Sequence, residues 1–178
     1  VGYGMDEGVE MGPVISAKAK SRITGLIDDA EKRGAKVALD GRGLKVEGYE
    51  GGFWLGPTVL THVPLDAPAY KEEIFGPVLC IVDAKNYAEA IEIVNASEFG
   101  NGAAIFTNDG GYARRFQLDV EAGMVGVNVP IPTPVAYYSF GGWKESLLGD
   151  THIHGPEGVR FYTRAPGGPR SPVRTPRR

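Results

Sequence analysis

The chain has 178 residues, of which 42% are hydrophobic and 23% are charged, and its formal net charge is −3. These values are ordinary for a globular protein, and the small negative charge gives no electrostatic basis for binding nucleic acid or an anionic membrane. No apolar run is long enough to span a bilayer, and the first residues do not resemble a signal peptide. The single cysteine excludes an internal disulfide and is typical of a reducing compartment, so we expect a cytoplasmic protein.

The first predicted element is a helix that follows a glycine-rich opening. Residues 1–13 contain four glycines and no hydrophobic periodicity, so they do not resemble the start of a domain. Ser16 is a suitable N-cap, and Gly34 suits the position after a helix C-terminus. Between them, apolar residues at helical spacing predict a buried face made of Ile23, Leu26, Ile27 and Ala30.

Short strands and a tight corner come next. Residues 36–39 and 53–60 resemble strands, and the glycine-rich stretch between them predicts a turn or hairpin. Further on, Glu-Glu-Ile-Phe-Gly-Pro-Val at residues 72–78 contains a Gly-Pro pair that forces a bend. The apolar run at 78–82 then predicts a strand buried on both faces. Cys80 lies inside this run, so we interpret it as a core residue rather than a nucleophile.

The corner places Glu73 and Phe75 at the mouth of a predicted α/β sheet. A carboxylate there can accept two hydroxyl hydrogen bonds at once, which is how ribose diols are commonly held. A phenylalanine can supply a flat apolar wall beside a ring. The alternative is a solvated acidic turn with one core Phe, and residue spacing alone favours that alternative.

From residue 78 onward, strands and helices alternate. The predicted order is a strand at 78–82, a helix from 86 or 87 to about 96, a strand at 103–106, a helix over 111–120 and a strand at 124–128. Asn86 and Glu89 fit a capping box, and the inward positions of the first helix are expected to be Ala88, Ile91 and Val94. Alternation with short connections implies right-handed crossovers and a parallel sheet, so the predicted fold class is α/β.

Beyond Asn128 the chain becomes irregular. Three prolines at residues 129–134 favour an extended or looped path, and residues 158–164 resemble a last strand. The Pro-, Gly- and Arg-rich residues 165–178 cannot build a core, so we expect disorder there. His152 and His154 would share one face of a strand, but no further ligand is placed to complete a metal site, and we predict none.

The segment at residues 72–78 resembles a signature of the aldehyde dehydrogenase superfamily, and further landmarks of that superfamily follow in the same order. They lie at residues 11–16, 56–58, 101–107, 122–128 and 140–144, within a similarity that extends from about residue 5 to 164. The resemblance implies three regions: a partial α/β catalytic and cofactor-contacting region at 1–128, a substrate-tunnel and oligomerisation segment at 129–164, and a disordered tail at 165–178.

The same resemblance implies roles for four residues. Glu73 would hold the nicotinamide-side ribose of NAD, and Phe75 would pack beside it. Phe140 would form a wall of the substrate tunnel, and Asn128 ends a strand where sites in parallel α/β sheets gather. For these last two, a core aromatic residue and a strand-end cap are equal alternatives. The catalytic cysteine of the family is expected upstream of the first residue, so we assign no catalytic residue in this chain.

Three departures from the common pattern, at residues 101–102, 126–132 and 148–152, resemble the CoA-acylating methylmalonate-semialdehyde dehydrogenase branch. That branch implies oxidation of malonate or methylmalonate semialdehyde with NAD, and transfer of the acyl group to CoA with loss of carbon dioxide, in valine and inositol breakdown. The alternatives are part of an ordinary aldehyde dehydrogenase, or a non-catalytic assembly chain. The family is homo-oligomeric, but four prolines after Arg164 replace its inter-subunit strand and place that assembly in doubt here.

Overall fold

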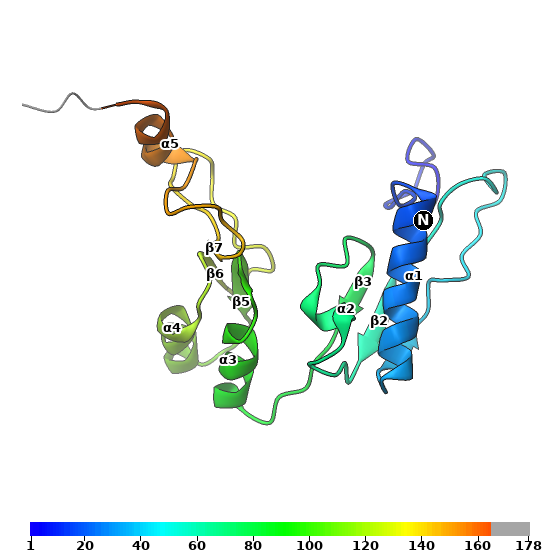
Figure 1. Ribbon diagram of the computed structural model, residues 1–178, viewed down its shortest axis with the longest axis horizontal. Coiled ribbons are helices and arrows are strands. Elements are labelled where there is room, and N and C mark those ends of the chain that lie inside the picture. Colours follow the sequence, from blue (N-terminus) through cyan, green and yellow to red (C-terminus); the bar gives the residue numbers. More distant parts are fainter. Residues whose placement is uncertain (165–178) are drawn as a thin grey trace, which may run out of the picture. The chain divides into compact units, whose positions relative to one another are not determined.

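The computed structural model describes residues 1–164, and the chain divides into two compact units, Val1–Lys85 and Asn86–Arg178 (Figure 1). The predicted tail at 165–178 lies outside the described residues, and the predicted boundary at 128 falls within the second unit and stays a prediction. Among the described residues, no helix is long and apolar enough to cross a membrane.

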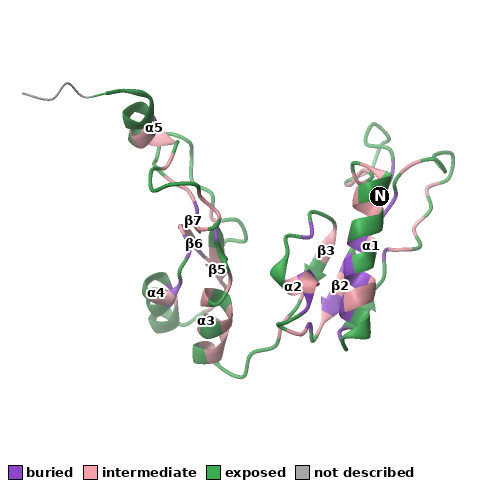
Figure 2. Cartoon of the chain, viewed as in Figure 1, coloured by how far each residue is buried: buried purple, intermediate pink, exposed green. Residues whose placement is uncertain are grey.

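The first unit is built on helix α1 (Ala17–Lys32). The helix begins where the Ser16 hydroxyl oxygen accepts a hydrogen bond from the Ala19 amide at 3.1 Å, and it ends before Gly34, whose φ is +107°. Both ends agree with the prediction. The predicted apolar stripe is also confirmed, and Figure 2 shows it as the purple band along α1, formed by Ile23, Leu26, Ile27 and Ala30.

This stripe packs against a small mixed sheet. The sheet has the order β1-β2-β3 and consists of β1 (Lys36–Leu39), β2 (Thr58–Thr61) and β3 (Val78–Cys80). β1 and β2 are antiparallel, whereas β2 and β3 are parallel. The core between helix and sheet also includes Leu55, Leu60 and Val63. The predicted strand at 53–60 therefore begins only at Thr58, and residues 53–57 lead into it.

The expectation for the apolar run after the corner is corrected in two respects. β3 is the outer strand of its sheet and is not buried on both faces, since Leu79 is 58% exposed. The strand pairs with β2 and not with the later strands of the chain. The Ile81 amide extends this pairing by donating a hydrogen bond to the Leu60 carbonyl. The parallel pairing that we predicted across the whole chain is thus local to each unit.

The second unit contains the predicted strand–helix–strand repeat. Its elements are α3 (Tyr87–Asn95), β4 (Phe99–Gly100), β5 (Gly102–Ile105), α4 (Gly110–Asp119), β6 (Met124–Val127), β7 (Trp143–Lys144) and α5 (Gly155–Tyr162). β5 and β6 are parallel with α4 between them, as predicted, whereas β4 and β7 form a separate antiparallel pair. Phe116 is the largest buried side chain of the small core beneath them.

Helix α3 has the predicted start but a different inward face. The Asn86 side chain accepts a hydrogen bond from the Glu89 amide at 3.1 Å, which confirms the cap. Ala88 and Val94 are exposed, so that part of the prediction is wrong. The face turned to α4 instead consists of Tyr87, Ile91 and Asn95, which are spaced four residues apart. Ile91 packs on the core, and the side chains of Tyr87 and Asn95 donate hydrogen bonds to Asp119.

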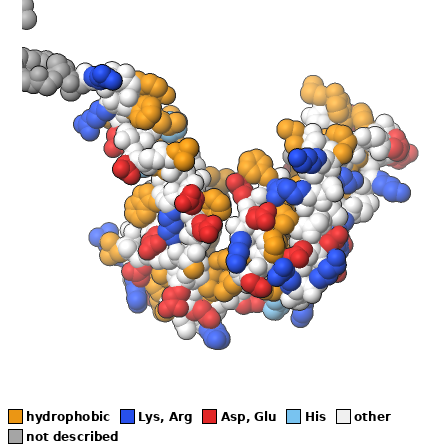
Figure 3. Space-filling view, viewed as in Figure 1, with side chains coloured by type: hydrophobic (Ala, Val, Ile, Leu, Met, Phe, Trp, Pro, Cys, Tyr) orange, Lys and Arg blue, Asp and Glu red, His pale blue; other side chains and the backbone are white. Residues whose placement is uncertain are grey.

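The run at 158–164, which resembled a strand, is mostly helix α5. Pro156 occupies the first turn, where its fixed φ favours a helix and its missing N–H costs nothing. Gly155 before it has a φ of +64°, which a β-strand would not accept. Apolar side chains of α5 remain on the surface, and Figure 3 shows them gathered at this end of the unit; they include Val159, Phe161 and Tyr162.

The approach of the corner to α1 predicts the effect of a single methyl group. A Cβ on Gly76 would lie 2.6 Å from the terminal methyl of Ile23, which is fully buried. Gly76→Ala should therefore lower the free energy of unfolding by about 1–3 kcal/mol, measured by denaturant titration. Gly25→Ala is the matched control, because a Cβ there meets nothing within 4 Å and should stabilise α1 by about 0.5–1 kcal/mol. A Gly76→Ala chain as stable as the parent would contradict this packing.

Candidate functional site

The acidic corner of the first unit is tied to α1 by one arginine. It follows the short helix α2 (Pro68–Lys71), whose C-cap is Glu72. From α1, the Arg22 guanidinium donates to the backbone carbonyl of Glu73 at 3.3 Å and to that of Ile74. A second guanidinium nitrogen lies 3.8 Å from the Glu72 carboxylate. The backbone of the corner is therefore fixed, and Glu72 is engaged in an exposed ion pair.

The two predicted binding residues of this corner face outward. Phe75 is 78% exposed and has a φ of +54°, a left-handed conformation that a bulky side chain rarely adopts. Such backbone strain persists where the surroundings impose it, and it concentrates at binding sites. Within residues 1–164, the exposed Glu73 carboxylate accepts no hydrogen bond and forms no ion pair. Glu73 and Phe75 together present a carboxylate and an aromatic surface to a ligand.

Asn128 lies at the end of β6, as predicted, and both the oxygen and the nitrogen of its side-chain amide are hydrogen-bonded. The amide oxygen accepts from the Thr107 backbone N–H at 2.9 Å, and the amide nitrogen donates to the Thr107 carbonyl at 3.0 Å. Asn128 has a φ of +55°, a conformation that asparagine tolerates better than most residues. This reciprocal pair connects the ends of β5 and β6 and matches the strand-end cap alternative.

Phe140 is half-buried and stacks on a histidine that the sequence had not connected with it. The Phe140 and His154 rings lie 4.3 Å apart between centroids and are parallel within 2°. Beside Phe140, the Ser139 hydroxyl donates to the Glu157 carboxylate at 2.6 Å, and this bond, together with the charge of His152, holds the pKa of Glu157 below its ordinary value. His152 and His154 do not lie on a strand, so the strand geometry assumed for them is wrong.

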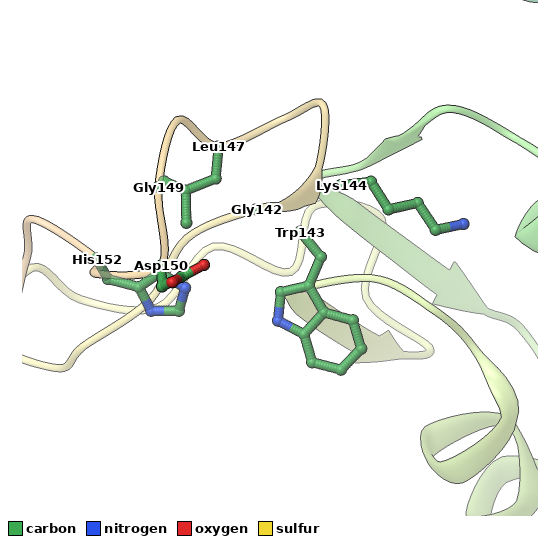
Figure 4. Close-up of a pocket in the computed structure, with 7 residues that line it drawn as sticks. All are labelled: Gly142, Trp143, Lys144, Leu147, Gly149, Asp150 and His152. Atoms are coloured by element: carbon green, nitrogen blue, oxygen red, sulfur yellow. The ribbon is translucent and has the colours of Figure 1, made fainter.

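A cavity of about 590 Å³ lies next to this segment in the second unit (Figure 4). Its lining residues are Gly142, Trp143, Lys144, Leu147, Gly149, Asp150 and His152. Lys144 is fixed there because its ammonium donates to the carbonyls of Asn95 and Ser97 at 2.7 and 3.1 Å and pairs with Glu121 at 2.9 Å. Sequence reasoning missed this role of Lys144, because the carbonyls that hold its ammonium lie 49 and 47 residues earlier in the chain.

Cys80 lies partly buried against the core of the first unit. Its thiol donates to the Ala69 carbonyl at 3.4 Å, and burial raises the pKa of the thiol above its ordinary value. A thiol in this state is a poor nucleophile at neutral pH. This supports the interpretation of Cys80 as a structural residue. Among residues 1–164, no group of three or more histidine, cysteine, aspartate or glutamate side chains is placed to hold a metal ion.

These features define part of an α/β enzyme domain, with an acidic and aromatic corner entering one parallel strand and a strand–helix–strand unit after it. Residues 1–166 match the aldehyde dehydrogenase family. The chain belongs to the aldehyde dehydrogenase family. The prediction made from the ordered motifs is thereby confirmed.

Relatives within this family match nearly all of the chain. A malonate-semialdehyde dehydrogenase of Pseudomonas aeruginosa is 53% identical over 92% of this chain and 33% of its own length. An acylating methylmalonate-semialdehyde dehydrogenase of Arabidopsis thaliana is 51% identical over 90% of this chain and 26% of its own length. The chain thus spans about a third or less of the length of these relatives.

Solved structures agree with the sequence comparisons. A methylmalonate-semialdehyde dehydrogenase structure from Sinorhizobium meliloti, complexed with NAD, superposes with a TM-score of 0.87 at 50% identity, over 89% of this chain and 32% of that one. A betaine aldehyde dehydrogenase from Staphylococcus aureus, complexed with NAD+, has a TM-score of 0.80 at 33% identity, over 88% of this chain and 30% of that one. The described part of the chain therefore has the aldehyde dehydrogenase fold, as predicted.

The environment of Cys80 predicts slow alkylation of its thiol. Because its pKa is raised in the folded state, less thiolate is present at pH 8 than in the unfolded chain. Iodoacetamide should modify the folded chain at least about tenfold more slowly than the chain in guanidinium chloride, followed by mass spectrometry. Equal rates in the two states would show that folding neither shields the Cys80 thiol nor raises its pKa, and would contradict the structural role.

Proposed function

We propose that the chain is part of an NAD-dependent, CoA-acylating malonate or methylmalonate-semialdehyde dehydrogenase. The observation that carries this proposal is the free Glu73 carboxylate next to the exposed Phe75, in a chain about 50% identical to relatives with those names. The reaction would convert semialdehyde, CoA and NAD into acyl-CoA, carbon dioxide and NADH. Betaine aldehyde dehydrogenase, an ordinary family member, is more distant at 33% identity.

In this proposal the corner of the first unit holds part of the cofactor. The Glu73 carboxylate would accept both hydroxyl hydrogen bonds of the nicotinamide-side ribose, because no protein group competes for its oxygens among the described residues. The Phe75 ring would cover the adjoining apolar surface. NAD, when bound, supplies the hydride acceptor. Arg22 keeps the corner in place through the backbone and leaves Glu73 free.

The residues of the second unit would act on the substrate side. Phe140 would form a wall of the aldehyde tunnel, since its ring is held by stacking rather than sealed inside the core. Asn128 would contribute through the shape of the β6 terminus, because both ends of its amide already bond to Thr107. CoA would be the acyl acceptor, and no catalytic residue is assigned within this chain. The isolated chain is expected to be inactive.

We also propose a cytoplasmic location and a homo-oligomeric assembly for the complete enzyme. The location is supported by the single free cysteine, although the Arabidopsis and bovine relatives are named as mitochondrial. The assembly is proposed from the family resemblance alone. The departure from the family sequence after Arg164 lies outside the described residues.

The ribose assignment is testable in a chimaera that joins residues 1–164 to the upstream part of a CoA-acylating relative. Glu73→Gln keeps size and shape but weakens a charge-assisted pair of hydrogen bonds. Bonds to a charged group contribute about 1.5–3 kcal/mol, so use of NAD should fall roughly ten- to hundredfold. The fall should appear in the apparent Michaelis constant for NAD or in the rate of hydride transfer, measured by NADH absorbance.

Glu72→Gln is the matched control for this experiment. It removes one exposed ion pair with Arg22, which costs less than about 1 kcal/mol of stability and no cofactor contact. Its NAD kinetics should therefore match the parent. If the two variants behave alike, or Glu72 is the more sensitive residue, the ribose assignment is wrong. Both variants must unfold at the temperature of the parent for the comparison to report on the site.

A further inference from the structure

The start of α5 and the segment before Phe140 lie unusually close together. The Gly155 amide donates to the Ala136 carbonyl at 3.2 Å. A Cβ at Gly155 would lie 2.5 Å from the Tyr138 carbonyl carbon and 2.6 Å from the Ser139 amide nitrogen. Gly155 also has a φ of +64°. A residue with a side chain would therefore push the helix away, so glycine is what permits this approach.

Side chains add further contacts across the same junction. Ser139 bonds to Glu157 in the first turn of α5, and His154, the N-cap residue, stacks on Phe140. A Cβ on Gly141 would lie 2.6 Å from Cδ2 of His152, so the residue after Phe140 also abuts this junction. The residues before and after Phe140, Ser139 and Gly141, therefore both contact this junction, and the His154 ring covers one face of the Phe140 ring.

The serine, histidine and glutamate of this junction do not form a nucleophile triad. A triad needs the imidazole between the hydroxyl and the carboxylate, with one ring nitrogen for each. Here the Ser139 oxygen and the Glu157 carboxylate both approach Nδ1 of His152, at 3.4 and 3.7 Å. The Ser139 proton is donated directly to Glu157. The geometry is that of a structural clamp.

The imidazole of His154 has one evident task in this clamp. His154 caps α5 through its backbone position, and its side chain makes no capping hydrogen bond. Its ring therefore contributes through the parallel stack with Phe140. Such a stack fixes the plane of the partner ring, because rotation about the Cβ–Cγ bond of Phe140 would break the contact.

We infer that His154 is a positioning residue that sets the plane of the Phe140 ring and thereby the branching of the aldehyde that the site accepts. This inference rests on the proposed function, in which Phe140 is a wall of the substrate tunnel. A wall ring held in one plane distinguishes a straight semialdehyde from its α-methyl-branched counterpart. A ring free to rotate discriminates less between them.

The stack itself is tested first in the 178-residue chain. In proton NMR spectra, the ring protons of His154 should be shifted upfield by the Phe140 ring. Phe140→Leu should abolish that shift, whereas Thr151→Ala, an exposed change in the same loop, should leave it in place. A His154 signal that does not respond to Phe140→Leu overturns the inference, whatever the activity of the enzyme.

The effect on selectivity is tested in the chimaera described above. His154→Ala and His154→Leu should change the ratio of kcat/KM for malonate semialdehyde to that for methylmalonate semialdehyde by about three- to tenfold. The Michaelis constant for NAD should stay unchanged. His154→Phe, which keeps a flat ring, should restore the ratio, and Thr151→Ala should not alter it. The leucine variant retains apolar bulk, so it reports on ring planarity even where the alanine variant folds poorly.

The outcomes separate this inference from the proposed function. An active parent chimaera whose selectivity is the same in the His154 variants overturns the positioning role and leaves the proposed function standing. Equal losses of kcat/KM for both semialdehydes, together with weaker use of NAD, indicate a purely structural role of His154 and also overturn the positioning role. A correctly folded parent chimaera that oxidises neither semialdehyde overturns the proposed function, and the inference with it.

Discussion

The interaction between Arg22 and the two carbonyls of the acidic corner is the constraint on which the first unit depends. A charged guanidinium bonded to backbone carbonyls fixes the path of residues 73–74 directly from α1. Gly76 then passes close to Ile23, and the Thr58 amide bonds to the Pro77 carbonyl at 2.8 Å, so the corner enters the ladder of β2 and β3. Fixing the corner by its backbone leaves the carboxylate of Glu73 free for a ligand.

Features encoded by neighbouring residues could be read from the sequence. The cap at Ser16, the cap at Asn86 and the end of α1 at Gly34 each involve groups only a few residues apart, so their signals are local. The parallel pair of β5 and β6 could also be predicted, because a short helix between two apolar runs leaves few other arrangements. The corner itself was visible from the Gly-Pro pair.

Features that depend on distant partners could not be read in this way. Nothing close to Glu73 in the sequence indicates that Arg22 would hold its carbonyl, 51 residues away. The exposure of Leu79 depends on which elements cover β3, whereas the residue types of β3 indicate only that the strand is apolar. The run at 158–164 was predicted as a strand without reference to Pro156, whereas in the structure this proline and the glycine before it start helix α5.

The two aromatic residues proposed for the site are held in opposite ways, and this difference has a physical consequence. Phe75 is positioned by its backbone: its φ of +54° and the anchored carbonyl before it direct a ring that is 78% exposed. Phe140 is positioned by its ring, through the stack with His154. A backbone-held ring keeps its location when neighbouring side chains change, whereas a stacked ring depends on its partner. In the proposed enzyme, substitutions in α5 would therefore alter the wall formed by Phe140 while leaving the corner at Glu73 unchanged, so aldehyde preference would vary independently of NAD binding.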